Sequence, residues 1–506
     1  MKRLNEHKVD GGSMLVQILV FAGIAMLLIT ALIGWAATNV LASRQAFYRE
    51  QAFQIAEAGI EYYRWHIAHA PNDYQDGTGV VGPYVHDFTD KEGNIIGTFT
   101  LDIVPPPIGS TVVVVRSKGV VNAYPSVYRR IEVKFAKPSF AKYAAVSNAG
   151  IGYGQGDEVF GPIHSNNFVK FFNGNPRPVA HNLVTSALAN YKSGSTNYYG
   201  VFTLVSPADP TAQSPSTPPL PPPSRPDVFM AGRQFPVPVV DFAGITNDLS
   251  LLQTEAQTSG FYRGSSGANG YKIVLNTNNT FDIYTVNTLL APPSAGGQDK
   301  CVKDVTEPNG ENNWGSWSID ASVGATTLIG NFAIPADGIL FFEDHVWVEG
   351  QINNTRVTII AGTLPDNSAT RKNIIVNNNL LYTNFDGQDA IGLIAQGDFL
   401  IGLASANNLT IDAAIIAQNG ATFRYYYRPP SGGRNYCGPY HTRASLTTYG
   451  MFATYLQAYF LQVQPHGNSG YLSQPATYDA NLLYAPPPLF PLTSDQYQTL
   501  YWQEIK

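Results

Sequence analysis

The first strong pattern along the chain is apolar. Residues 14–37 are almost entirely hydrophobic, and none of the 33 residues between Asp10 and Arg44 is Asp, Glu, Lys or Arg. A helix needs roughly 20 apolar residues to cross the hydrocarbon of a bilayer. The pattern therefore predicts a transmembrane helix over residues 13–42, and it argues against a purely cytosolic protein.

The helical pattern continues beyond the apolar segment. Between Ser43 and Ala70 there is no proline, and apolar residues recur at steps of three and four, at Phe53, Ala56, Ile60, Tyr63 and Ile67. Charged residues fall on an adjacent arc of the same helix. We expect one continuous helix over residues 13–70, roughly 85 Å long at 1.5 Å per residue, which ends at Pro71.

Alternating apolar and polar residues then predict strands. The alternation covers residues 97–103 and 131–135, and a short apolar run covers residues 112–115, with a turn expected over residues 122–126. Such a period of two is typical of a sheet with one buried face. Residues 43–137 are therefore expected to form an amphipathic helix followed by a small antiparallel sheet.

The remainder divides by composition. We expect a β-rich extension over residues 138–204, a semi-rigid linker over residues 205–239 where proline is dense, and a mixed α/β segment over residues 240–333. Within that segment a helix is expected at 245–257, and strands are expected at 271–275 and 280–286.

Beyond residue 334, short β-rich runs alternate with Gly and Asn clusters, from Ile339–Phe342 to Thr422–Tyr426. Runs this short cannot bury themselves alone, which favours a β-helix or related solenoid over residues 334–506. Their spacing is irregular, so a β-sandwich remains open. The expected fold class is α+β, mostly β.

Composition narrows the partners. The 506 residues are 13% charged with a formal net charge of −6 and no Lys/Arg block, whereas roughly 25% charge is ordinary. Nucleic acid is therefore a poor partner, and no cofactor is expected. The two cysteines, Cys301 and Cys437, could form a disulfide outside the membrane or remain unrelated free thiols.

The N-terminus indicates topology. The first twelve residues, MKRLNEHKVDGG, carry Lys2, Arg3 and Lys8, and basic residues beside a first span usually stay in the cytoplasm. We therefore expect a single-pass membrane protein with a cytoplasmic N-terminus and its bulk outside. The apolar core is too long for a conventional secretory signal.

A short basic leader that ends in Gly12 and precedes an uninterrupted apolar helix resembles the class III leader of type IV pilins. The resemblance implies a prepilin-type leader over residues 1–12, cut between Gly12 and Ser13 by a prepilin peptidase of the inner membrane. The family usually has Phe at the first mature position and Glu at the fifth, a position used in assembly, where this chain has Ser13 and Gln17. This difference argues against a major-pilin role. An uncleaved signal anchor is the alternative.

A second resemblance follows the apolar segment. The stretch EQAFQIAEAGIEYYRW, residues 50–65, is similar to the corresponding region of PilX-type minor pilins, with Ala56, Glu57, Ala58 and Gly59 in the order of the family's small-residue motif. It implies other pilin-like subunits and the pilus assembly machinery as partners. Ordinary close packing of small residues on a helix face would give the same motif.

Catalytic chemistry has weak support. A carboxylate cluster on a β-helix could cleave polysaccharide, and the candidates are Glu343, Asp344, Glu349, Asp386, Asp389, Asp398 and Asp412. Asp386 and Asp389 fall short of the 6 to 8 oxygens that Ca²⁺ takes, and His164 has no second ligand at metal spacing. We expect no enzyme. A glycan or cell ligand for the C-terminal block remains a hypothesis, with Tyr425, Tyr426 and Tyr427 as aromatic platforms.

Overall fold

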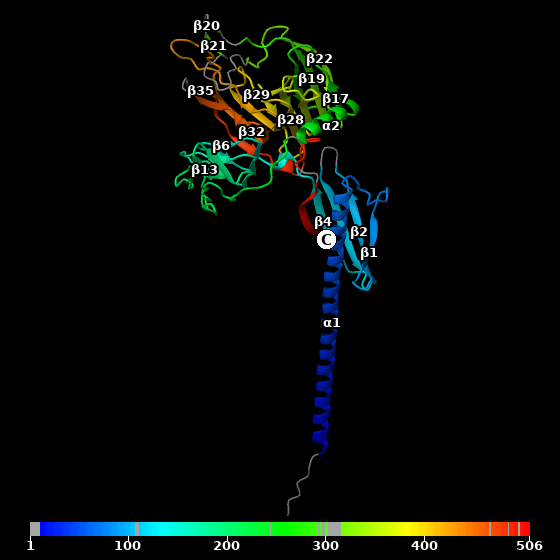
Figure 1. Cartoon of the computed structure of the whole chain (residues 1–506). Helices are drawn as coiled ribbons and strands as arrows, with labels where there is room; N and C mark the ends of the chain where they lie inside the picture. The colour runs from blue at the N-terminus through cyan, green and yellow to red at the C-terminus, as the bar shows by residue number, and fades with distance from the viewer. Residues whose placement is uncertain are drawn as a thin grey trace, which may run out of the picture. The chain divides into compact units, whose positions relative to one another are not determined.

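The computed structural model describes residues 11–106, 111–242, 244–291, 294–295, 299–301, 315–464, 467–483, 485–493 and 496–505. It divides into two compact units, which are described separately. Unit 1 comprises residues 1–105, 113–135 and 499–506, and unit 2 comprises residues 106–112 and 136–498. The protein is mostly β, with one long helix at the N-terminal end of the described chain (Figure 1).

In unit 1, helix α1 (Gly11–His69) is continuous over 59 residues. Both the continuity and the end of the predicted helix are confirmed. The last turn closes with the Ala70 amide donating to the carbonyl of His66, and Pro71 follows. Figure 1 shows the first half of α1 standing free and the second half lying along the sheet.

The sheet of unit 1 has the strand order β1-β2-β3-β4-β37. Neighbours from β1 to β4 pair antiparallel. The predicted strands correspond to β2, β3 and β4, and the predicted turn lies between β3 and β4. Sequence reasoning missed the two edge strands. The bounds are β1 (Tyr84–Thr89), β2 (Ile95–Val104), β3 (Val113–Val121), β4 (Tyr128–Ala136) and β37 (Gln498–Ile505).

The last strand returns from the far end of the chain. Arg129 on β4 forms an ion pair with Glu504 on β37, and the Lys134 ammonium lies 5.2 Å from the centre of the Tyr501 ring. Sequence number rises along one strand as it falls along the other, so β37 runs antiparallel to β4. The segment expected as one domain over residues 334–506 therefore loses its last strand to unit 1, whose sheet β37 completes.

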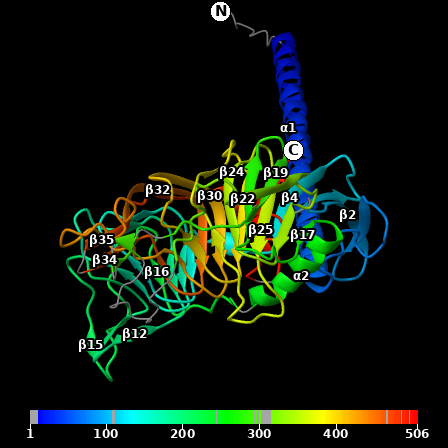
Figure 2. The same ribbon diagram turned by 90° about the horizontal axis from the view of Figure 1, so that it is seen from above.

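Unit 2 is organised by two parallel ladders, which together we call the parallel stack (Figure 2). In the first ladder, β32 pairs with β5, so the earliest strand lies beside one of the latest. Its spatial order is β17 (Phe261–Arg263), β23 (Ile339–Phe342), β25 (Arg356–Ala361), β28 (Ala390–Ala395), β30 (Asn408–Ala417), β32 (Thr442–Thr454), β5 (Ala145–Ser147), β8 (Ile163–Ser165), β11 (Val184–Ser186) and β16 (Arg233–Gln234).

The second ladder runs through β18, β24, β26, β29, β31 and β33, again with parallel pairing. The predicted strands at 271–275 and 280–286 correspond to β18 and β19, and the β-rich runs beyond residue 334 coincide with β23 to β31. The bounds are β18 (Tyr271–Asn276), β24 (Val346–Gln351), β26 (Ile374–Ile375), β29 (Phe399–Ile401), β31 (Thr422–Arg424) and β33 (Ala458–Tyr459).

Shorter elements complete unit 2. Their bounds are β6 (Ile151–Tyr153), β7 (Glu158–Val159), β9 (Val169–Phe171), β10 (Val179–Ala180), β12 (Asn190–Ser193), β13 (Thr196–Tyr199), β14 (Val201–Thr203), β15 (Ala212–Gln213), β19 (Thr280–Val286), β20 (Ser294–Ala295), β21 (Asp299–Lys300), β22 (Thr326–Ala333), β27 (Leu380–Leu381), β34 (Leu461–Gln464), β35 (Gly467–Ser473), β36 (Ala476–Tyr478), and the 3₁₀ turns η1 (Phe140–Lys142) and η2 (Ala480–Leu483).

Both faces of the first ladder are buried. Leu393 belongs to a core between the ladders, whereas its neighbour Ile394 belongs to a second core that includes Leu249 and Leu252 of α2 (Gly244–Thr258). Helix α2 matches the predicted helix at 245–257, and Figure 2 shows it beside β17. Double burial explains why these strands are uninterrupted apolar runs.

The Pro-rich segment 205–239 differs from the expected linker because it is packed. Val228 and Phe229 are buried in a core with Val169 and Phe171, and β16 pairs with β11.

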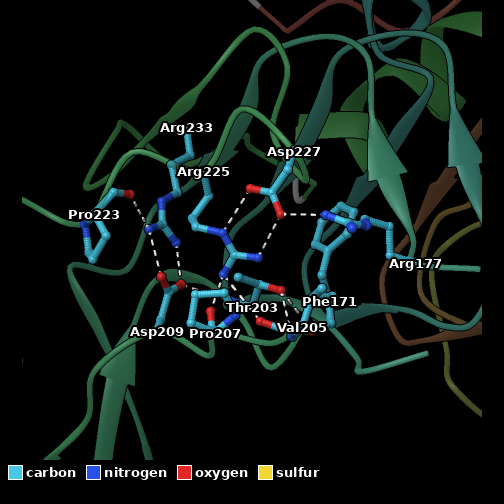
Figure 3. Close-up of polar contacts among 10 residues, drawn as sticks. All are labelled: Phe171, Arg177, Thr203, Val205, Pro207, Asp209, Pro223, Arg225, Asp227 and Arg233. Atoms are coloured by element: carbon cyan, nitrogen blue, oxygen red, sulfur yellow. Dashed lines mark hydrogen bonds and ion pairs between the residues drawn. The ribbon is translucent and has the colours of Figure 1, made fainter. Parts of the chain in front are cut away.

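Buried ion pairs fix the Pro-rich segment (Figure 3). The Arg233 guanidinium donates to Asp209 at 2.9 Å, with side chains only 5% and 3% exposed. Arg225 donates to Asp227 at 2.9 Å and also to the Pro207 carbonyl. Proline dictates an extended backbone here but leaves carbonyls free to accept these bonds.

Candidate membrane and assembly helix

The apolar half of α1 is the largest exposed hydrophobic surface of unit 1. Every residue from Met14 to Phe47 is exposed, including Phe21 at 71% and Leu27 at 73%. By length and composition, the segment that begins at Met14 can cross a membrane. An apolar surface of this size requires a bilayer or protein partner to cover it.

Two threonine hydroxyls within this half are satisfied by the helix itself. The Thr30 hydroxyl donates to the Met26 carbonyl and the Thr38 hydroxyl donates to the Gly34 carbonyl, both at 2.7 Å. Such bonds to the preceding turn let a hydroxyl enter an apolar medium without an orphaned donor. These two threonines can therefore face lipid without an unsatisfied hydroxyl.

The residues of the predicted processing site lie at the start of α1. Residues 1–10, which make up most of the expected leader, lie outside the described residues. Gly12 and Ser13 fall within the first turn of the helix, and Gln17 is exposed one turn later. Gln17 therefore places a neutral amide on an otherwise apolar surface.

The small-residue motif brings helix and sheet backbones together. Ala56 and Gly59 are buried, Ala58 is half-buried and Glu57 is exposed. A Cβ added to Gly59 would meet the Ser117 hydroxyl at 2.4 Å. The buried members of the motif thus pack against β3, as the close-packing alternative expects.

The sheet matches this with a glycine of its own. A Cβ added to Gly119 of β3 would lie 2.1 Å from the Ala52 carbonyl oxygen and 2.4 Å from the Ala56 nitrogen. Both neighbours are backbone atoms, which cannot turn aside as a flexible side chain can. Glycine at 119 therefore sets how closely α1 approaches the sheet.

The first group of carboxylates is engaged internally. Asp344 is 3% exposed and accepts bonds from the Ser266 amide at 2.9 Å and hydroxyl at 2.7 Å. Burial raises the pKa of Asp344, but the bonds from Ser266 and His345 and the charge of Lys372 outweigh it, so the pKa lies below its usual value. Glu343 accepts from Gln253 at 2.6 Å.

The other carboxylates accept hydrogen bonds in the loops that connect successive strands. Asp389 accepts from the amides of Thr355, Thr383 and Asn384, and Asp398 accepts from the amide of Ala421 at 2.8 Å. Asp386 is exposed and bonds Gln388. Among the residues searched within the described chain, no group of three His, Cys, Asp or Glu side chains could hold a metal.

Asp412 differs in its electrostatics. It is 3% exposed, and its carboxylate accepts from the Tyr382 amide at 3.0 Å. Burial, together with the nearby charge of Asp479, raises the pKa of Asp412 to about 6. Such a shift often marks a functional group, but in this location it also makes Asp412 a source of pH-dependent stability.

The remaining candidates have structural surroundings. The His164 ring nitrogens lie 2.9 Å from the Thr185 hydroxyl and 3.0 Å from the Asn166 amide oxygen. The proposed aromatic platforms need correction, because Tyr426 and Tyr427 are 2% and 0% exposed and only Tyr425 is half-buried.

The two cysteines are joined. Cys301 and Cys437 form a disulfide in unit 2, with Cα atoms 4.6 Å apart. Their 136-residue separation means that the bond closes a long loop, the case in which a cross-link constrains the unfolded chain most on the entropy model.

One surface feature escaped the sequence analysis. A cleft of about 300 Å³ in unit 2 is lined by residues from β18, β24 and the loops 318–326 and 377–378. Of the polar residues that line it, only Glu349 was among the candidate carboxylates of the sequence analysis. Its partners Lys272 and Asn378 lie far from it in sequence. No local motif connects the three, so only the pairing of strands could reveal them.

Comparisons with known proteins add one finding. No family model matches the chain, and no curated protein matches it in sequence. Among solved structures, the chain is similar to the competence-associated pilin ComZ from Thermus thermophilus, with 13% identity and a TM-score of 0.32. The match covers 90% of this chain and 97% of that one.

Proposed function

We propose that this protein is a membrane-anchored, pilin-like subunit of a type IV pilus or related filament, which displays unit 2 outside the membrane. One observation carries the proposal. A single continuous helix has an uncharged, fully exposed first half and a second half packed through Ala56 and Gly59 onto an antiparallel sheet. The first half suits storage in a bilayer and later packing among other subunits.

The expected topology follows from charge. With Lys2, Arg3 and Lys8 retained in the cytoplasm, the helix crosses the inner membrane once, and the sheet of unit 1 and the whole of unit 2 lie beyond the membrane. The disulfide between Cys301 and Cys437 fits an oxidising compartment. The proposed partners are prepilin peptidase, the assembly machinery and other pilin-like subunits.

Gln17 supports a minor rather than a major subunit. A neutral amide at this exposed position can accept a hydrogen bond from a neighbour's amino terminus, but it supplies no charge for an ion pair. A subunit with a weaker contact suits a place used once or rarely in a filament. The PilX-type motif at residues 56–59 is consistent with that role.

For unit 2 we infer a β-solenoid. The two ladders pair parallel over successive strands, which stacked coils require. A β-sandwich would pair its strands antiparallel. Five of the seven candidate carboxylates in this body accept hydrogen bonds from backbone amides, so we propose a display and binding role without catalysis.

Processing of the N-terminus tests the proposal. The mature protein purified from its host is expected to begin at Ser13, and Gly12→Val is expected to block the cut, whereas the matched variant Gly11→Val leaves it intact. N-terminal sequencing and intact mass reveal each outcome. A wild-type protein that begins at Met1, with or without prepilin peptidase, would leave the signal-anchored adhesin as the better description.

A second experiment separates a filament subunit from a plain anchor. Cells are sheared, and the filament fraction is probed with an antibody against unit 2. A pilin-like subunit is expected in that fraction in wild-type cells and only in membranes in the Gly12→Val strain. Equal retention in membranes for both strains contradicts assembly.

A further inference from the structure

The cleft of unit 2 contains a preformed set of polar contacts. The Lys272 ammonium lies 2.6 Å from one oxygen of Glu349, and the Asn378 amide donates to the other oxygen at 2.6 Å. The side chains of Lys272 and Glu349 are only 24% and 22% exposed. The carboxylate is therefore held between two donors and cannot swing freely.

The same three side chains keep unused hydrogen-bonding capacity. An ammonium has three donors, and a primary amide has two donors and an acceptor oxygen, so contacts with Glu349 leave Lys272 and Asn378 with donors and an acceptor to spare. Across the loop 318–326, Asp320 accepts from Ser322 at 2.6 Å. The cleft thus presents donors and acceptors side by side.

Two residues that line the cleft, Trp347 and Asn377, are held by hydrogen bonds to Trp317, which adjoins the lining residue Ser318. The carbonyl of Trp317 accepts from the Trp347 indole at 3.1 Å and from the Asn377 amide at 2.8 Å. Trp317 has a φ of +51°, a left-handed conformation that a bulky side chain rarely adopts. Strain of this kind persists only where the surroundings impose it, and it is concentrated at ligand-binding sites.

Charge and polarity select the class of ligand. Lys272, Glu349 and Asp320 sum to one negative charge, which disfavours phosphates, nucleic acids and acidic sugars. Trp347 and Val348 are 3% and 2% exposed, so the cleft presents little apolar surface to a hydrophobic ligand. A volume of about 300 Å³ is at the lower end for small-molecule sites.

We propose that this cleft binds an uncharged saccharide, whose neighbouring hydroxyls both donate and accept. Lys272 and Asn378 would donate to ring and hydroxyl oxygens, while Glu349 and Asp320 would accept from hydroxyls. The inference rests on the proposed display role only for its biological use, because binding itself is a property of the isolated protein.

The test uses the full chain purified in detergent and isothermal titration calorimetry. The probes are maltotriose, cellotriose, laminaritriose and tri-N-acetylchitotriose, with trigalacturonate as the acidic counterpart. At least one neutral trisaccharide is expected to bind, and trigalacturonate is expected to bind more weakly than that probe. Glu349→Gln and Asn378→Ala are each expected to weaken binding about tenfold or more, because the first replaces an acceptor oxygen with a donor and the second removes the amide altogether.

Gln388→Ala is the matched control, since this residue bonds Asp386 on the same body outside the cleft. Thermal unfolding of all variants checks that unit 2 remains folded. Failure of every neutral trisaccharide to bind overturns the inference, as does tighter binding of trigalacturonate, or unchanged affinity in both folded variants. Processing at Gly12 and recovery in the sheared fraction are measured separately, so failure here leaves the proposed function standing.

Discussion

The sheet of unit 1 and the first ladder of unit 2 are covered by helices in opposite ways. In unit 1, α1 presents Ala52 and Ala56 to Gly119, and backbone atoms come close enough to exclude even a methyl group. In unit 2, α2 presents Leu249 and Leu252 to large ladder side chains. The first interface depends on the absence of side chains, whereas the second depends on their volume.

The two units also differ in how they bury charge. In unit 2, Arg233 and Asp209 are almost completely buried, and Asp412 is buried near the charge of Asp479. In unit 1, the pair between Arg129 and Glu504 is about one third exposed. Loss of the partner of a buried arginine should therefore matter most in unit 2, whereas steric substitutions should matter most at the helix of unit 1.

The largest effect is expected for Asp209→Ala. The variant leaves the Arg233 guanidinium buried without its partner, which typically costs about 3–5 kcal/mol. Denaturant unfolding gives the loss, and hydrogen exchange should place it in residues 180–240. Glu61→Ala is the control, since the Glu61 and Arg64 side chains of this ion pair are 56% and 58% exposed and the loss should cost about 1 kcal/mol or less. Equal losses would contradict the contrast between buried and exposed pairs.

A smaller effect is expected for Gly119→Val. The new side chain would overlap backbone atoms of Ala52 and Ala56, and overpacking of this kind typically costs about 1–3 kcal/mol. Faster hydrogen exchange should appear in residues 50–70 and in β3, with unit 2 unchanged. Lys118→Val, on the opposite face of the same strand, should leave exchange near wild type. If the amides of α1 exchange as slowly in Gly119→Val as in the wild type, the close approach of helix and sheet is not required for the stability of unit 1.

The smallest effect is a gain in stability. Burial raises the pKa of Asp412 to about 6, above the usual 3.9, so between about pH 4 and 6 the folded chain holds a proton that the unfolded chain has lost. Stability from this group is thus full below pH 4 and is lost as the pH rises through 6. Asp412→Asn should add roughly 1–2 kcal/mol at pH 7 and flatten the pH profile, because the amide oxygen still accepts from Tyr382.

The measurement is denaturant unfolding at pH 4, 5, 6 and 7. Asp386→Asn provides the control, because Asp386 is exposed and its hydrogen bonds to Gln388 lower the pKa. If the Asp412→Asn variant keeps the wild-type dependence of the unfolding free energy on pH, that dependence belongs to another group.

The contrast between the units also explains what the sequence could predict. The strands of unit 1 face a helix on one side only, so β2 and β4 show the alternation that marks a strand. In unit 2, burial on both faces removes the alternation, and runs such as Ile339–Phe342 indicate strands without indicating which strand pairs with which. The position of β5 beside β32 follows from no local pattern.

Other features depend on contacts distant in sequence. The strand β1 lies in a loop rich in Gly, Asp and Tyr that conceals its short alternation, and β37 needs a partner more than 350 residues away. The Pro-rich segment indicated an extended backbone correctly, but its packing depends on Arg225 and Arg233. Likewise Glu349 was visible in the sequence, whereas Lys272 and Asn378 became its partners only through strand pairing.

The pairing of β37 with β4 determines when the sheet of unit 1 can be completed. Residues 136–498 separate these two neighbours, so β4 is an open strand edge until the whole insertion has been synthesised. At about 5–20 residues per second, that wait lasts on the order of 20–70 s. Exposed edges can recruit foreign strands, so a folding helper that protects β4 during synthesis would act on the youngest chains and be redundant once β37 has paired.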